Sequence, residues 1–247
     1  MIEEIKSGIF NTGSFRELSK ITESLSKDSQ LTIQNACGAL IAFTVVKVFE
    51  TRSQVLLITT DKDSAEKTYD DCSLLTGGHN VCLFGERPAK EVEILDISAP
   101  ISQIETLKAL TSNSKNLVVA SPYSLMSKVP LPAEFQKNIL ELDIEKQHDF
   151  QKLLQQLEEM NFERKDFVEG CGDFAVRGGI VDVFPFVGSN PVRLEFFGNT
   201  IESIREFDVL SQRSIRELQS ASIVPDFAKS TDNSSDNNSA SLFDYLN

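Results

Sequence analysis

Two arginines and one phenylalanine, Arg177, Arg193 and Phe197, are the residues of this chain best suited to specific recognition chemistry. They lie between residues 172 and 208, in the sequence GDFAVRGGIVDVFPFVGSNPVRLEFFGNTIESIREFD. A guanidinium group forms planar, bidentate pairs with carboxylates. An aromatic side chain beside Glu and Arg on a polar face has the composition of a protein-binding hot spot. These residue types therefore indicate docking of another protein rather than catalysis.

The strands that must position these residues can be counted, because successive side chains of a strand point to opposite faces. In residues 192–197, the inward set is Val192, Leu194 and Phe196, and the outward set is Arg193, Glu195 and Phe197. The same count in residues 174–177 puts Phe174 and Val176 inward, and Ala175 and Arg177 outward. Gly198-Asn199 then predicts the turn of a hairpin, with residues 201–209 as the returning strand.

A purely structural role is the alternative for the same residues. In that case Arg177 and Arg193 pair with Asp182 or Glu195 on a solvated sheet face, where ion pairs contribute little. A neighbouring helix then covers Phe197, and single exposed apolar residues are in any case normal. The pattern alone leaves both interpretations open.

The segment from residue 153 to residue 218 resembles the UvrA-binding domain shared by UvrB and the bacterial transcription-repair coupling factors. The resemblance depends jointly on three strings, GDFAVRGGIVDVFP, PVRLEFFG and FDVLSQRS. UvrB proteins tend to have an Asp-Pro-(Leu)-Thr-Gly pattern where this chain has DVLSQRS. The coupling-factor family is therefore the more similar of the two.

This resemblance implies that the partner is UvrA. In the family, the UvrA contact includes two arginines and a phenylalanine, which fall by motif on Arg177, Arg193 and Phe197. It also implies that the chain is the amino-terminal adaptor module of a longer protein. That protein would displace stalled RNA polymerase from double-stranded DNA and recruit nucleotide excision repair. ATP and Mg²⁺, RNA polymerase and DNA would be bound by its other regions, one of which could mask the UvrA surface.

Composition restricts the other function classes. The 247 residues are 40% apolar and 25% charged, which is typical of a soluble globular protein of one large or two ordinary domains. A formal net charge of −13 argues against broad binding to DNA phosphates. No apolar run approaches the roughly 20 residues of a membrane span, so no membrane contact and a cytoplasmic protein are expected. No metal site is expected from four cysteines without CxxC spacing, which are Cys37, Cys72, Cys82 and Cys171.

The first part of the chain alternates between helices and apolar strands, which predicts an α/β layer with a mostly parallel sheet. Helices are expected at 15–25, 39–49 and 101–110, buried strands at 55–60 and 117–120, and a short strand at 80–84. Beyond Pro130 and Pro132, a strand at 139–144 and a helix at 150–160 precede the β-rich segment. We therefore expect a degenerate nucleotide-binding-like domain at 1–130, of the RecA or helicase type, and a smaller α+β UvrA-binding domain at 131–225.

The first domain lacks the residues of a phosphate-binding loop. Such a loop needs a glycine-rich turn, a lysine and a Ser or Thr for Mg²⁺. UvrB has this loop near residues 33–40, where the present chain reads IQNACGAL. No cofactor, no ATP hydrolysis and no catalytic residue are therefore expected here. The rival interpretation is a UvrB-like repair domain with residual nucleotide or DNA binding through a nonstandard site.

The end of the chain reads as a tether and a short docking segment. Residues 226–241, DFAKSTDNSSDNNSAS, have almost no apolar side chains, which predicts a flexible linker. Residues 242–247 contain the apolar cluster LFDYL, which suggests a segment that returns to the first domain. A SLFDYL-like stretch follows the UvrA-binding domain in the coupling-factor family, so the chain resembles a fragment of such a protein.

Overall fold

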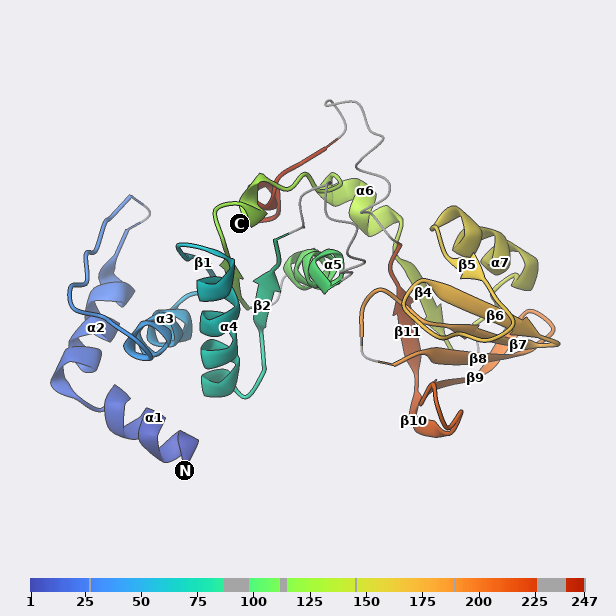
Figure 1. Ribbon diagram of the computed structural model, residues 1–247, viewed down its shortest axis with the longest axis horizontal. Coiled ribbons are helices and arrows are strands. Elements are labelled where there is room, and N and C mark those ends of the chain that lie inside the picture. Colours follow the sequence, from blue (N-terminus) through green and yellow to red (C-terminus); the bar gives the residue numbers. More distant parts are fainter. Residues whose placement is uncertain are drawn as a thin grey trace. The chain divides into compact units, whose positions relative to one another are not determined.

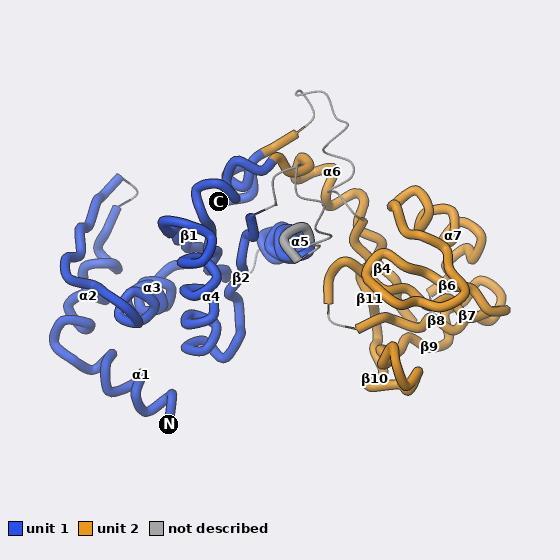
Figure 2. The backbone as a smooth tube through the Cα atoms, viewed as in Figure 1, with its two compact units in different colours: residues 1–127, 241–247 blue, residues 128–240 orange. Residues whose placement is uncertain are grey.

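The chain divides into two compact units, each with its own hydrophobic core. A computed structural model describes residues 1–26, 28–86, 98–111, 115–144, 146–188, 190–225 and 239–246. Unit 1 comprises residues 1–127 and 241–247, and unit 2 comprises residues 128–240 (Figure 2). The predicted tether at 226–241 lies outside the described residues from 226 to 238.

Unit 1 is a small parallel sheet with helices (Figure 1). Its strands pair in the order β1-β3-β2, and both pairings are parallel, as the alternation of strands and helices predicts. The elements are α1 (Ile2–Phe10), α2 (Gly13–Ser24), α3 (Leu40–Thr51), β1 (Gln54–Ile58), α4 (Lys62–Thr76), β2 (Val81–Phe84), α5 (Ser98–Thr111), β3 (Asn116–Ala120), and the short 3-10 helices η1 (Ser124–Met126) and η3 (Leu242–Tyr245).

The burial of these strands follows from their place in the sheet. The central strand β3 is buried along its whole length, as predicted for residues 117–120. The prediction of a buried strand at 55–60 is wrong in this respect, because β1 lies at an edge, is half-buried and leaves Ile58 exposed. Apolar side chains of α3 and α4 pack with those of the strands; the core includes Phe43, Val46, Phe49, Cys72, Leu75, Leu117 and Val119.

The thiols of Cys72 and Cys82 are expected to resist alkylation in the folded protein. Burial raises the pKa of the Cys72 thiol to about 12 and that of Cys82 to about 11. Because the thiolate is the reactive form, both thiols should be nearly inert at pH 8, whereas the exposed Cys37 should react quickly. Mass spectrometry after iodoacetamide treatment, with and without urea, measures this. Labelling of Cys72 in native protein as fast as that of Cys37 would contradict the packing of unit 1.

The carboxyl-terminal segment belongs to unit 1. Helix η3 packs against α5, with Leu242 fully buried and Tyr245 nearly so. Ser241 and Asp244 close a capping box, in which the Asp244 carboxylate accepts hydrogen bonds from the Ser241 backbone N–H at 2.7 Å and from its hydroxyl at 2.9 Å. The segment is thus an integral part of the unit that the first 127 residues build.

Unit 2 is a six-stranded sheet with a helix on one face (Figure 1). The strand order is β10-β9-β8-β7-β6-β5, and all pairs are antiparallel except β5 with β6. A separate antiparallel pair joins β4 and β11. The elements are α6 (Pro132–Lys137), β4 (Leu140–Asp143), α7 (Phe150–Glu159), β5 (Glu163–Arg164), β6 (Asp173–Arg177), β7 (Ile180–Val183), β8 (Val192–Phe197), β9 (Thr200–Phe207), β10 (Ser214–Leu218) and β11 (Ser220–Ile223).

Helix α7 covers the apolar face of this sheet. The Asp149 carboxylate caps the helix by accepting from the Lys152 backbone N–H at 2.9 Å. Three leucines of α7, at 153, 154 and 157, are buried against inward side chains of the strands. These side chains include Phe174, Val181, Val183, Leu194 and Ile204. The helix and the inward residues of β6 and β8 therefore lie as the sequence predicts.

Candidate functional site

The site lies on the face of strands β6 to β9 that is turned away from α7. We call this the outer face; it carries Ala175, Arg177, Asp182, Arg193, Glu195, Ser203 and Arg205. The register places Arg193 directly across from Asp182, and Arg177 stands one diagonal step away on β6. Antiparallel pairing therefore brings two arginines within reach of one carboxylate.

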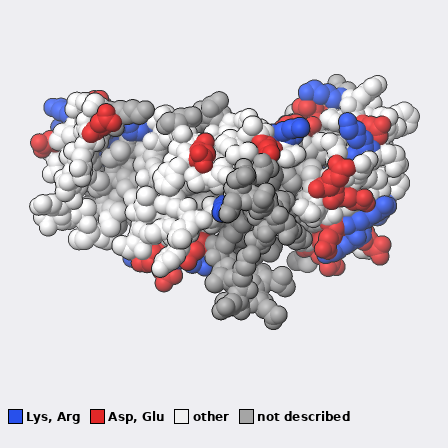
Figure 3. Space-filling view, turned by 90° about the horizontal axis from the view of Figure 1, so that it is seen from above, with Lys and Arg blue, Asp and Glu red and all other residues white. Residues whose placement is uncertain are grey.

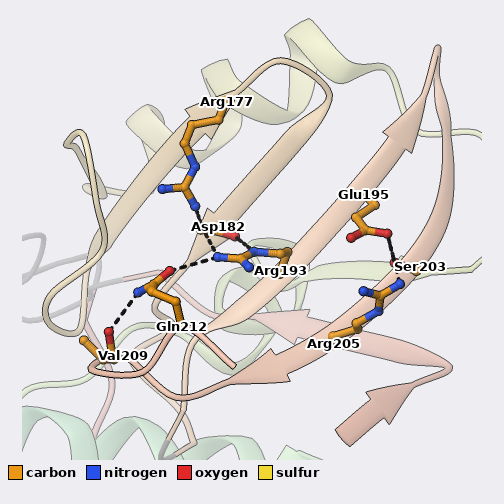
Figure 4. Close-up of polar contacts among 8 residues, drawn as sticks. All are labelled: Arg177, Asp182, Arg193, Glu195, Ser203, Arg205, Val209 and Gln212. Carbon is orange, nitrogen blue, oxygen red and sulfur yellow. Dashed lines mark hydrogen bonds and ion pairs between the residues drawn. The ribbon is translucent and has the colours of Figure 1, made fainter. Parts of the chain in front are cut away.

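Asp182 binds both arginines (Figure 4). Its carboxylate accepts from Arg193 in a bidentate pair, at 2.7 Å from Nε and 2.9 Å from a terminal nitrogen. It also accepts a hydrogen bond from Arg177. The Asp182 side chain is only 2% exposed. A carboxylate so buried needs paired cations, so the arginines and Asp182 form one structural unit with a net charge of +1, from two guanidiniums and one carboxylate.

Arg193 is the more enclosed of the two arginines. Its side chain is 18% exposed, and its guanidinium carbon lies 4.4 Å from the centroid of the buried Phe207 ring. A terminal nitrogen also donates to the Gln212 side-chain oxygen at 3.0 Å. Hydrogen bonding to Asp182 raises the pKa of Arg193 above its ordinary value. Arg193 therefore holds a fixed, charged position between two strands and a loop.

That loop, residues 208–213, is closed by hydrogen bonds of its own. Asp208 Oδ1 accepts from the Ser211 backbone N–H at 2.8 Å, and Gln212 adopts a left-handed backbone conformation with φ of 56°. The Gln212 side-chain nitrogen donates to the Val209 carbonyl at 2.8 Å (Figure 4). Gln212 consequently presents its side-chain oxygen to Arg193, which gives the FDVLSQRS string a physical role.

Arg177 reaches further into solvent. Its side chain is 37% exposed, and its guanidinium carbon lies 5.1 Å from the centroid of the exposed Phe167 ring. Stacking on an aromatic face and pairing with Asp182 both fix the orientation of the guanidinium. Among the described residues, Asp182 is the one acceptor that pairs with Arg177, so its other N–H groups can bind a partner.

Phe197 lies at the tip of the β8–β9 hairpin with its side chain 76% exposed. Gly198 takes a φ of 61° in the turn, as the Gly198-Asn199 pair predicts. The register shifts between Glu195, which pairs with Ser203, and Phe196, which pairs with Ile201. Glu202 is therefore an extra, bulged residue of β9. This bulge keeps Phe196 packed on Phe150, at 5.2 Å between ring centroids, and leaves Phe197 on the outer face.

Residues 140–228 match a family model described as the UvrB interaction domain. This part of the chain is therefore similar to a UvrB interaction domain. It is also similar to the transcription-repair-coupling factor of Bacillus subtilis (strain 168), with 33% identity over 192 residues, which cover 76% of this chain and 16% of that protein. The coupling factors of two Staphylococcus aureus strains, Mu50 and USA300, are 30% identical over 75% of this chain and 16% of their own length. The resemblance to coupling factors is therefore confirmed, and the chain spans about a sixth of the length of these relatives.

The predicted site residues all lie within the residues that match the family model and on one face of the sheet, but in different environments. Arg177 and Arg193 are joined through Asp182, and Phe197 stands apart at the hairpin tip, where no helix of the described residues covers it. Of the two carboxylates proposed as structural partners, Asp182 binds the arginines, whereas Glu195 accepts from Ser203 at 2.6 Å and from Arg205 at 3.2 Å.

Ala175 points to the outer face, as predicted, but it does not meet solvent there. It is 1% exposed, because Val168 and Phe207 cover it in a second small apolar cluster on that face. The sequence pattern also missed Gln212 and Phe167 as partners of the arginines. Gln212 belongs to the FDVLSQRS string, so the motif could have pointed to it. Phe167 lies in an irregular segment, where no motif or strand period indicates a role.

The rest of the chain gives less support for a functional site. Residues 33–40 run into the start of α3, and no strand occurs among the described residues before that helix. Within the described part of the chain, no His, Cys, Asp and Glu side chains group in a way that could hold a metal ion. None of the helices in that part combines the length and apolar character that a membrane crossing requires. The expectation that the fragment hydrolyses no ATP stays a prediction.

Proposed function

We propose that this chain is an adaptor module of a transcription-repair coupling factor and that it binds UvrA through Arg177, Arg193 and Phe197. The proposal is carried by one observation. A phenylalanine that is 76% exposed stands on the same outer face as two arginines already fixed by Asp182, within the residues that match the UvrB interaction domain. Aromatic and arginine side chains are the usual anchors of protein interfaces. Those already held in place lose little conformational entropy on binding.

The two arginines would contribute differently. Arg177 is the direct contact, because its partly exposed guanidinium can pair with a carboxylate of UvrA. Arg193 is largely a positioning residue, since Asp182, Gln212 and Phe207 already surround it. Phe197 supplies the apolar anchor of the interface.

The adaptor role extends to a longer parent protein in this proposal. Such a protein would use ATP and Mg²⁺ in other regions to translocate on double-stranded DNA and displace stalled RNA polymerase. The module would then recruit UvrA to the lesion for excision repair. A further domain of the parent would cover the outer face until UvrA is needed. The relatives, in which the matched residues make up only 16% of the length, leave room for these regions.

Phe197→Ala is expected to weaken UvrA binding about 30-fold, equivalent to about 2 kcal/mol, because it removes an interface anchor. Its effect on stability should be within about 0.5 kcal/mol, as for an exposed side chain. Arg177→Ala should weaken binding by a similar factor. Titration calorimetry and co-elution of the fragment with UvrA on a sizing column measure both effects.

Phe243→Ala provides the matched control, since Phe243 is also an exposed phenylalanine, 54% accessible, but lies in unit 1. The control should bind UvrA like the unmodified chain. Unchanged binding of folded Phe197→Ala and Arg177→Ala variants would overturn the site assignment. Absence of any complex with the unmodified chain would overturn the adaptor role.

A further inference from the structure

The edge strand β5 covers only part of its neighbour β6. β5 has two residues, whereas β6 has five. The last backbone hydrogen bond between them runs from the Lys165 N–H to the Phe174 carbonyl at 2.9 Å. The chain then leaves the edge and crosses to the outer face, where Val168 is buried against Ala175. The second half of β6 is left at the open edge of the sheet.

Val176 presents its backbone groups to this open edge. In a strand, the backbone N–H and C=O of residues two apart point to the same side. The Phe174 carbonyl points toward β5, so the backbone N–H and C=O of Val176 also point to that side, away from β7. Among the described residues, no backbone hydrogen bond reaches Val176 from that side. An exposed strand edge with unpaired backbone groups is a template for pairing with another chain.

A groove of about 810 Å³ runs along this edge, and its lining is cationic. The residues that line it are Arg164, Lys165, Asp166, Phe167, Val176 and Arg177. Lys165 pairs with Asp173 at 2.7 Å and Arg177 pairs with Asp182, whereas the exposed Arg164 has no ion-pair partner among the described residues. Three cations and one carboxylate line the groove, and two of these cations are already paired with Asp173 and Asp182, so Arg164 is the cation left for a partner, in a chain whose formal net charge is −13.

We propose that the open edge of β6 receives an acidic, extended segment of UvrA as an added strand. The backbone of Val176 would pair with that segment, and the acidic side chains would meet Arg164 and Arg177. Phe167 would pack against the intervening residue of the segment. Strand addition of this kind supplies affinity through the main chain and specificity through alternate side chains. The inference rests on the proposed function, which names UvrA as the partner.

Protein is favoured over nucleic acid as the occupant. Binding to phosphates depends on a broad array of Lys and Arg, whereas Figure 3 shows cationic and acidic side chains interspersed on the described part of the face in view. An extended acidic segment offers both things that this site can bind. Its backbone groups can pair with the open strand edge, and its carboxylates can pair with the cations of the groove. Unit 2 would then contact UvrA with both its outer face and its edge.

Hydrogen exchange in the UvrA complex tests the added strand. The Val176 amide should exchange at least about tenfold more slowly in the complex than in the free chain, because a buried backbone hydrogen bond protects it. Mass spectrometry with fragmentation that resolves Val176 from the turn residues Gly178 and Gly179 measures this rate. Arg164→Glu should weaken UvrA binding about tenfold and make the remaining affinity less sensitive to salt.

Lys152→Glu is the matched control, because it makes the same charge reversal at an exposed residue of α7, on the opposite face of the sheet. It should bind UvrA like the unmodified chain. Loss of binding in Phe197→Ala, together with unprotected Val176 and normal binding of Arg164→Glu, would overturn the added strand and leave the adaptor role intact. Failure of the unmodified chain to bind UvrA would overturn the adaptor role and this inference with it. Preferential binding of single-stranded DNA, lost in Arg164→Glu, would replace the acidic segment by a nucleic acid.

Discussion

Asp182→Asn is expected to lower the free energy of unfolding of unit 2 by about 3 kcal/mol, because it leaves two guanidiniums without their shared carboxylate. Arg193 is affected most, since only 18% of its side chain is exposed and it lies over the Phe207 ring. The asparagine has nearly the same shape, so the loss reports charge rather than cavity formation. Urea unfolding followed by circular dichroism, together with amide exchange of β7 and β8, measures the change.

Glu195→Gln is the control for Asp182→Asn. Glu195 lies on the same outer face and pairs with Arg205, but both side chains are 33% exposed. Solvent-exposed ion pairs contribute about 0 to 1 kcal/mol, so this variant should retain nearly all of its stability. If both variants lost the same small amount of stability, burial of Asp182 would not be what makes its ion pairs stabilising.

The same change should also weaken docking. In Asp182→Asn, the guanidinium of Arg177 loses the charged partner that fixes its orientation. The ordering of that side chain must then take place on binding, at a cost of about 0.5–1.5 kcal/mol. UvrA affinity measured at a temperature where the variant stays folded should therefore fall, even though Asp182 itself is buried.

Leu242→Ala is expected to lower the free energy of unfolding of unit 1 by about 2–4 kcal/mol, the usual range for a buried leucine truncated to alanine. Leu242 is 0% exposed in the helix η3 that packs against α5. The truncation removes apolar contacts from a four-residue helix in which Leu242 and Tyr245 are the buried residues. Faster alkylation of Cys72 under native conditions measures the loss, because that thiol is protected only while unit 1 is folded.

The neighbouring residue supplies the control for Leu242→Ala. Phe243 is larger but 54% exposed, so Phe243→Ala should change stability by less than about 0.5 kcal/mol. Amide exchange in β7 and β8 should be unaltered in both variants, since those strands belong to unit 2. A loss of protection in both units from Leu242→Ala alone would contradict the assignment of the segment to unit 1.

Local patterns in the sequence predicted much of the fold. The alternation of helices and apolar strands predicted the parallel sheet of unit 1, and the two-residue period predicted the inward side chains of β8, such as Leu194. Gly198 marked the hairpin turn because it accepts positive φ without strain. Each of these signals is carried by residues close together in the chain. The half-buried state of β1 was missed because an edge position depends on strand order, which residues 54–58 do not contain.

The sequence by itself determined which side chains stand on the outer face, and through its motifs it determined the family to which residues 140–228 are similar. Only the tertiary structure decided what those side chains do there. Cross-strand register placed Asp182, rather than Glu195, between the arginines, and the crossing of Val168 buried Ala175. Register and coverage arise from residues far apart in the chain, and the period of a single strand carries no information on either. For the same reason, Phe197 stands out in the sequence, whereas the open edge at Val176 is visible only once β5 is seen to end after two residues.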